Sequence, residues 1–165
     1  MLPNKALQRA VLRAAAERQD VAVISMDIQA RYLIFHSALV LLAGLLVGVP
    51  YGRAVHRNAP DQVIKAWRLA HDTLTLGPTL GLVIAAVLSS LTVDAPIKSW
   101  LAWTWVVSNY GFCFSLPLAA MVGQRGRTLD KPLSNQLVLV GNMVGLGASS
   151  VGTLVLLYAA YVSLP

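Results

Sequence analysis

The chain carries four long runs of apolar residues that are separated by short polar segments. The runs extend over about residues 32–49, 67–93, 100–122 and 133–163. A helix needs about 20 apolar residues to cross the hydrocarbon core of a bilayer, and each run approaches or exceeds that length. The pattern therefore predicts four membrane-spanning helices. Because the connections are short, consecutive helices should be antiparallel, as in an up-down bundle.

A different pattern precedes the first run. Residues 3–22 carry charged side chains at every fourth position on one stripe and small or apolar side chains on another: Lys5, Arg9, Arg13 and Glu17 against Leu7, Val11, Ala14 and Ala15. This spacing predicts an amphipathic helix that lies among the lipid headgroups or on a cytoplasmic surface. An extension of the first membrane helix explains the pattern equally well.

Composition supports a membrane protein and excludes most soluble folds. Of 165 residues, 56% are hydrophobic and 12% are charged, whereas soluble domains have about 45–50% and about 25%. Intrinsic disorder requires the opposite balance. A chain of this length has room for one domain. We therefore expect an all-α integral membrane four-helix bundle in which residues 1–165 form a single domain.

The net charge of +6 points to the bilayer as a partner. The basic residues lie between the apolar runs and in the N-terminal segment, where they would meet anionic lipid headgroups rather than nucleic acid. The single cysteine, Cys113, excludes an intrachain disulfide and any cysteine-based zinc or iron–sulfur site.

Two histidines lie inside the apolar runs, where ionisable groups are expensive. His36 and His71 each lie about one turn into a run, and those two runs have opposite directions. The two side chains should therefore be separated by about half the bilayer or more and cannot ligate one metal together. A cofactor would then have one histidine ligand, which leaves an open position on a haem iron. From spacing alone, a hydrogen bond from His71 to the backbone is favoured over metal ligation, and His36 is expected to be a hydrogen-bonded structural residue.

Asn109 and Tyr110 form a close pair of hydrogen-bonding side chains in the third run. An asparagine at this depth usually bonds a neighbouring helix. A phenol beside an open metal site can instead position or protonate a substrate oxygen. Both interpretations remain open at this point.

Glycines recur at four-residue spacing in three runs: Gly44 and Gly48, Gly77 and Gly81, and Gly141 and Gly145. In lipid, where helices gain little from burying apolar surface, small residues allow the close backbone approach that holds helices together. The spacing predicts close helix contacts, either within one chain or between chains.

The second run also carries a more specific pattern. Residues 67–71 read Trp-Arg-Leu-Ala-His, or Trp-x-x-Ala-His, and residues 77–81 read Gly-Pro-Thr-Leu-Gly. This combination resembles the second helix of the styrene oxide isomerase family, small bacterial membrane proteins with four helices. The run led by His36 is similar to a histidine-led run in the family's first helix, and Arg125-Gly126 with Thr128 resembles an Arg-Gly-x-Thr stretch in its third loop. The resemblance covers roughly residues 32–163.

The resemblance implies a cofactor and a reaction. Family members are homotrimers of the bacterial inner (cytoplasmic) membrane with haem b between subunits. His71 would be the axial ligand. Ferric haem would act as a Lewis acid on the oxygen of a small aryl epoxide and yield an aldehyde without net redox change. The alternatives are a non-catalytic haem-binding or electron-transfer protein on the same scaffold, and a bundle without cofactor.

The chain departs from the family at three site positions. The family's asparagine on the second helix and its tyrosine and aspartate on the third are not retained: they correspond to Gly77 or Gly81, to Cys113 or Leu116, and to Trp105 or Ser108. Tyr110 and Asn109 are the candidates to replace these groups as catalytic residues.

Overall fold

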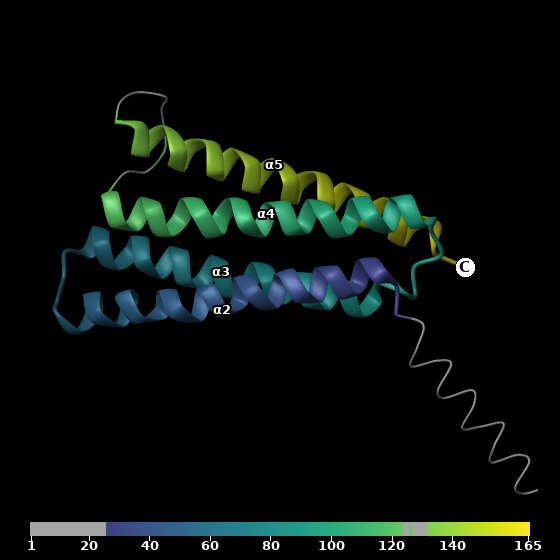
Figure 1. Cartoon of the computed structure of the whole chain (residues 1–165), viewed down its shortest axis with the longest axis horizontal. Coiled ribbons are helices and arrows are strands. Elements are labelled where there is room, and N and C mark those ends of the chain that lie inside the picture. The colour runs from purple at the N-terminus through teal and green to yellow at the C-terminus, as the bar shows by residue number, and fades with distance from the viewer. Residues whose placement is uncertain (1–25, 124–125, 127–131) are drawn as a thin grey trace, which may run out of the picture.

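The computed structural model describes residues 26–123, 126 and 132–165. These residues form four helices and no strand: α2 (Ile28–His56), α3 (Asp61–Leu88), α4 (Ala95–Val122) and α5 (Leu133–Val162). Consecutive helices are antiparallel (Figure 1). The predicted all-α four-helix bundle is thereby confirmed. The predicted amphipathic helix over residues 3–22 lies outside the described residues.

All four helices are long and apolar enough to cross a membrane. Large apolar side chains are exposed along each of them, for example Leu46 in α2 at 61% and Leu154 in α5 at 66%. Such surfaces are costly in water and match the acyl chains of a bilayer. The chain is therefore a multi-pass membrane protein, as the apolar runs predicted.

The helices differ from the apolar runs at their ends. The first run was expected to stop before Pro50, but α2 continues through this proline. A proline removes one backbone N–H, and membrane helices tolerate that loss where neighbouring groups compensate. α3 begins at Asp61 rather than near Trp67, and it ends at Leu88 rather than near residue 93. The carboxylate of Asp61 in the first turn interacts favourably with the partial positive charge of the helix N-terminus.

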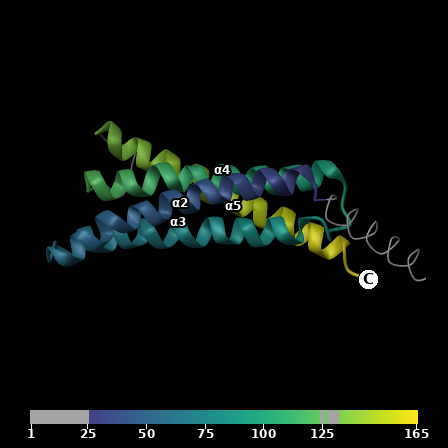
Figure 2. The same cartoon turned by 60° about the horizontal axis from the view of Figure 1, so that its bottom comes forward.

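α4 is the central helix of the described bundle, because it packs against each of the other three. The backbone of α5 approaches that of α4 but not those of α2 and α3. α5 lies near the end of α3 only toward its own C-terminus, where the backbone N–H of Thr92 donates to Ser163 Oγ at 2.9 Å. Toward its N-terminus it diverges from α3 (Figure 2).

The apolar core lies at the end of the bundle where α5 comes close. Val155 and Leu156 of α5 pack against this core. Its buried members come from α2, α3 and α4: Ala30, Leu33, Ile84, Ala85, Leu88, Leu101, Ala102 and Val106. No such cluster fills the opposite end of the described bundle, where α5 and α3 separate. The two ends of the molecule therefore differ in packing.

Glycines permit the closest helix contacts, as their spacing predicted. A Cβ atom at Gly44 of α2 would collide with the carbonyl oxygen of Leu74 in α3. A Cβ atom at Gly111 of α4 would lie 2.8 Å from the backbone nitrogen of Gly145 and 3.0 Å from the carbonyl oxygen of Gly141 in α5. These contacts occur within one chain and hold the pairs α2–α3 and α4–α5 together.

We expect the ion pair between Lys98 and Asp27 to stabilise the contact of α4 with the start of α2. The Nζ–Oδ2 distance is 2.7 Å, and the lysine side chain is only 13% exposed. Lys98→Met, which keeps the apolar stem, should lower the free energy of unfolding by about 1–2 kcal/mol, between the values for exposed and buried pairs. Thermal unfolding in detergent measures this. The control is Lys65→Met, whose pair with Asp61 is 3.9 Å long and exposed; an equal loss in both variants would contradict the prediction.

Candidate functional site

His71 lies in α3 against α2 and is half-buried. Its Nδ1 lies 2.9 Å from the carbonyl oxygen of Gly44. A carbonyl oxygen only accepts, so Nδ1 carries the proton and donates. A Cβ atom at Gly48 would lie 3.2 Å from Cε1 of the imidazole, so this glycine provides the space for the ring. The ring of Tyr51 stacks on the imidazole with 6.0 Å between centroids. The imidazole is thus held by α2, and in the neutral ring the second nitrogen, Nε2, carries the lone pair.

This arrangement fits an axial ligand of a haem iron. A histidine that binds metal is neutral and commonly donates its other ring N–H to a backbone carbonyl, which fixes the tautomer and orients the ring. The bond from Nδ1 of His71 to Gly44 has this form. It is also the backbone hydrogen bond that the spacing of His71 alone favoured. The two interpretations therefore do not compete, because the bond uses Nδ1 and leaves the lone pair of Nε2.

His36 occupies a separate place, between α2 and α4. Its Nδ1 lies 3.0 Å from the hydroxyl of Tyr110. The rings of Phe35 and Trp103 flank the imidazole at 5.4 and 5.8 Å between centroids. The hydrogen bond that was expected of His36 is therefore made, and it engages the phenol that was predicted to act on substrate.

The two histidines are far apart along the bundle. The imidazole of His71 bonds to Gly44 and packs beside Gly48, which lie eight and twelve positions after His36 in the same helix. At 1.5 Å per residue this separation is about 12–18 Å. The prediction that one chain cannot bring both histidines to one metal is confirmed. The hydroxyl of Tyr110 lies with His36 and is therefore also remote from His71.

Asn109 occupies a third place, between α3 and α4. Its side chain is 5% exposed, and its Oδ1 lies 3.0 Å from where a Cβ atom of Gly77 would be. Its Nδ2 is buried without a hydrogen-bond partner, and so is Oγ of Ser37, which lies beside Gly81. The three predicted site residues thus do not share one site within the chain. Roles for Asn109 and Tyr110 in catalysis stay predictions.

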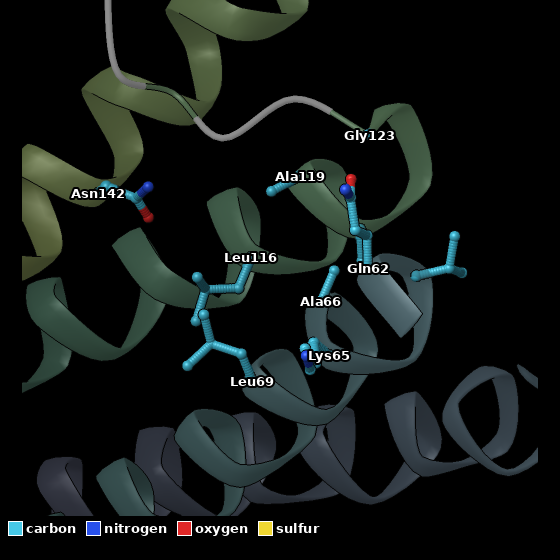
Figure 3. A pocket seen from close by; sticks show the side chains of 10 residues that line it. Gln62, Lys65, Ala66, Leu69, Leu116, Ala119, Gly123 and Asn142 are labelled. Carbon is cyan, nitrogen blue, oxygen red and sulfur yellow. The ribbon is translucent and has the colours of Figure 1, made fainter. Parts of the chain in front are cut away.

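The structure adds a cavity that the sequence did not indicate. It has a volume of about 470 Å³ and lies between α3, α4 and α5, where α5 diverges from α3 (Figure 3). Gln62 and Lys65 lie on one side and Asn142 on another, and the remaining lining is apolar or without a polar side chain: Val63, Ala66, Leu69, Leu116, Ala119, Ala120 and Gly123. The cavity is thus an apolar space with few polar groups, as in many small-molecule sites.

Asn142 is oriented within this cavity by Ser115. The buried hydroxyl of Ser115 donates to Oδ1 of Asn142 at 2.7 Å. A side-chain amide with its oxygen engaged in this way keeps two N–H donors on Nδ2. Asn142 is one of a few polar residues in the last apolar run, but nothing in the sequence places it beside a cavity.

Ser115 and Asn142 lie at about the depth of His71 in the bundle. Asn109 of α4 contacts Gly77 of α3. Ser115 follows Asn109 by six positions in α4, and His71 precedes Gly77 by six positions in α3. Because α3 and α4 are antiparallel, both steps lead toward the same end of the bundle, and Ser115 and His71 lie at the same level. His71 does not line the cavity. At 3.6 residues per turn its side chain is rotated by about 200° from that of Leu69, which does.

A family model described as styrene oxide isomerase matches residues 29–161, nearly the whole of the four helices. The chain belongs to the styrene oxide isomerase family. The resemblance predicted from residues 67–71 is thereby confirmed. No curated protein matches the chain.

The structure shows what surrounds the positions that correspond to the family's asparagine and tyrosine. The styrene oxide isomerase asparagine corresponds to Gly77 or Gly81, and the amide of Asn109 occupies the space beside both glycines. The family's tyrosine corresponds to Cys113 or Leu116, and Leu116 lines the cavity. An amide is therefore present near the expected position but is supplied by α4, whereas no phenol lines the cavity.

The family's aspartate corresponds to Trp105 or Ser108, and neither side chain has a carboxylate. The hydroxyl of Ser108 donates to the carbonyl oxygen of Gly145 at 2.8 Å and so joins α4 to α5. The indole Nε1 of Trp105 is buried without a hydrogen-bond partner. In this chain, Trp105 and Ser108 therefore pack helices together and do not supply the negative charge of an aspartate.

Proposed function

We propose that the protein is a membrane isomerase that converts a small hydrophobic epoxide, such as an aryl epoxide, into an aldehyde or other carbonyl compound. The proposal also includes a haem b held through Nε2 of His71. Membership of the styrene oxide isomerase family supports the reaction class. The observation that carries the haem ligand is the bond from Nδ1 of His71 to Gly44, which leaves Nε2 as the coordinating atom.

The chemistry divides between the cofactor and the chain. When bound, ferric haem supplies a Lewis acid for the epoxide oxygen. The carbonyl of Gly44 keeps the proton of His71 on Nδ1, and Tyr51 and Gly48 hold the ring in place. The apolar helices exclude water, which would otherwise open the epoxide to a diol. The substrate and product are isomers, since one C–O bond breaks and a hydride moves to the adjacent carbon, so no external oxidant or reductant is consumed.

The proposal includes a homo-oligomer, and the resemblance favours a trimer in the bacterial inner membrane. Two features of the chain support an assembly of this kind. The imidazole of His71 is half-buried at the side of the α2–α3 pair and does not line the cavity between α3, α4 and α5. The cavity beyond Leu69 lies on the opposite side of α3. A ring of subunits joins two such different faces.

The experiment is the incubation of purified ferric protein with styrene oxide, without reductant, followed by detection of aldehyde. We expect aldehyde to form at a rate proportional to haem content, and we expect none from the His71→Ala protein. If the haem is intact and neither styrene oxide nor related epoxides are converted, the isomerase proposal fails. The alternative, a non-catalytic haem-binding or electron-transfer protein, then replaces it; the missing family tyrosine and aspartate favour that alternative.

A further inference from the structure

We propose that the cavity between α3, α4 and α5 is the substrate pocket and that Nδ2 of Asn142 donates a hydrogen bond to the substrate oxygen. The ligand class is a small neutral apolar molecule with one acceptor oxygen, such as an epoxide. This inference rests on the proposed function for the identity of the reaction. It assigns a binding site and a polar residue on α5, Asn142, that corresponds to none of the family's site positions named above.

The size and lining of the cavity match such a ligand. A volume of about 470 Å³ lies within the range of small-molecule sites, about 300–1,000 Å³. Leucine, alanine and valine side chains form most of the wall, and the exposed surfaces of the surrounding helices are apolar. A hydrophobic epoxide dissolves in the bilayer and can enter from there. Burial of its aromatic ring would supply most of the binding free energy.

Asn142 supplies the directional contact. Its oxygen is engaged by Ser115, whose side chain is fully buried and thus fixed. The N–H groups of Nδ2 remain as donors at the wall of a largely apolar space. An epoxide or carbonyl oxygen satisfies this donor. A hydrocarbon chain offers no acceptor, and a phospholipid would place its acceptors near Lys65, on another side of the cavity (Figure 3).

The depth of the cavity agrees with the position of His71. Asn142 lies at about the level of His71, although the two face different sides of α3. Rotation about the membrane normal preserves depth, so in a ring of subunits every copy of His71 lies at the level of every cavity. A heterologous contact joins the His71 side of one subunit to the cavity side of the next. The substrate oxygen held by Asn142 would then lie at the level of a cofactor on the neighbouring subunit.

Tyr110 does not satisfy this condition. Its hydroxyl bonds to His36, about 12–18 Å along the bundle from His71. Rotation about the membrane normal does not change this separation. Asn142, unlike Tyr110, lies at the level where the reaction is proposed to take place.

The first test measures binding independently of turnover. The haem-containing protein and the His71→Ala protein are irradiated with an aryl trifluoromethyl diazirine, with and without excess styrene oxide, and the labelled residues are mapped by mass spectrometry. We expect labelling near Leu69, Leu116 and Ala119 that styrene oxide suppresses in both proteins. Labelling of these residues that styrene oxide does not suppress would overturn the pocket assignment. A lipid that occupies the cavity and excludes styrene oxide would give the same result and the same conclusion.

The second test fills the cavity or removes its donor. Ala119→Phe should abolish the protection by styrene oxide and raise KM at least tenfold. Ala160→Phe, at an exposed position of α5, should change neither. Asn142→Leu should lower kcat about 10²-fold, since a donor to an oxygen that gains negative charge is typically worth 10²–10³ in rate. Ser150→Ala, which removes only a bond to a carbonyl of its own helix, is the control for the loss of a polar side chain from α5.

The outcomes separate the two proposals. Protection at the cavity without turnover of any epoxide supports the pocket and rejects the isomerase. Turnover that is unchanged in both Ala119→Phe and Asn142→Leu supports the isomerase and rejects the pocket. Far-ultraviolet circular dichroism and thermal unfolding of each variant identify a folding defect. In that case the labelling of the unaltered protein decides.

Discussion

Replacing His71 with alanine should remove the Soret absorption of the purified protein almost completely. Among the histidines of the described residues, His71 is the one whose ring is oriented by a backbone carbonyl of the neighbouring helix: Nδ1 donates to Gly44, and Nε2 remains. Without this ligand the proposed haem would have no bond to the protein, and it should dissociate during purification. The measurement is the ratio of Soret absorbance to protein, with haem extracted and quantified separately.

The matched control is His36→Ala. His36 is also a half-buried histidine of the membrane region, but its Nδ1 is engaged by Tyr110 and its ring is enclosed by Phe35 and Trp103. We expect this variant to keep its haem and its Soret maximum. A His71→Ala protein with a full complement of haem and an unchanged spectrum would refute the ligand assignment. Loss of haem from both variants would indicate a general folding defect, and it would not support the assignment of His71 as the ligand.

The helices were predictable because bilayer thickness and hydropathy set their number and their minimum length. Their ends were not. α2 passes through Pro50 and α3 begins several residues before Trp67, in segments whose residues are too polar for the hydropathy pattern to include them. Local sequence shows where a helix must be apolar, but not how far it continues into the headgroup region.

The candidate site was predictable at His71 and not beyond it. Asn109 and Tyr110 are adjacent in sequence, but successive residues in a helix point about 100° apart. Asn109 therefore faces the glycines of α3, whereas Tyr110 reaches His36 of α2. Adjacency along the chain suggested a pair that the helix geometry separates.

The cavity and Asn142 were not predictable for a different reason. They depend on the divergence of α5 from α3, and a hydropathy pattern contains no information on the angle between two helices that are distant in sequence. The spacing of Gly141 and Gly145 indicated a close contact, and this contact is made with Gly111 of α4. It fixes α5 to α4 and so leaves the side of α3 that faces the cavity without contact from the backbone of α5.

Replacing Gly111 with leucine should destabilise the bundle strongly, because it forces α4 and α5 apart. A Cβ atom at this position would lie 2.8 Å from the backbone nitrogen of Gly145 and 3.0 Å from the carbonyl oxygen of Gly141. Backbone atoms cannot rotate away as a side chain can, so α4 and α5 must separate. Overpacking in cores typically costs about 1–3 kcal/mol, and we expect at least the upper value here. Denaturation by sodium dodecyl sulfate from dodecyl maltoside micelles, followed by circular dichroism, measures the change.

Gly147→Leu is the control for this prediction. Gly147 also lies in a membrane helix, but nothing would lie within 4 Å of a Cβ atom there. Because leucine favours a helix by up to about 1 kcal/mol over glycine, this variant should be as stable as the unaltered protein or more stable. The separation of α4 and α5 in Gly111→Leu should also break the bond from Ser115 to Asn142 and so release the amide that orients the proposed substrate. Equal stability of the two variants would show that α5 is not held to α4 through Gly111, and the cavity that depends on this contact would lose its structural basis.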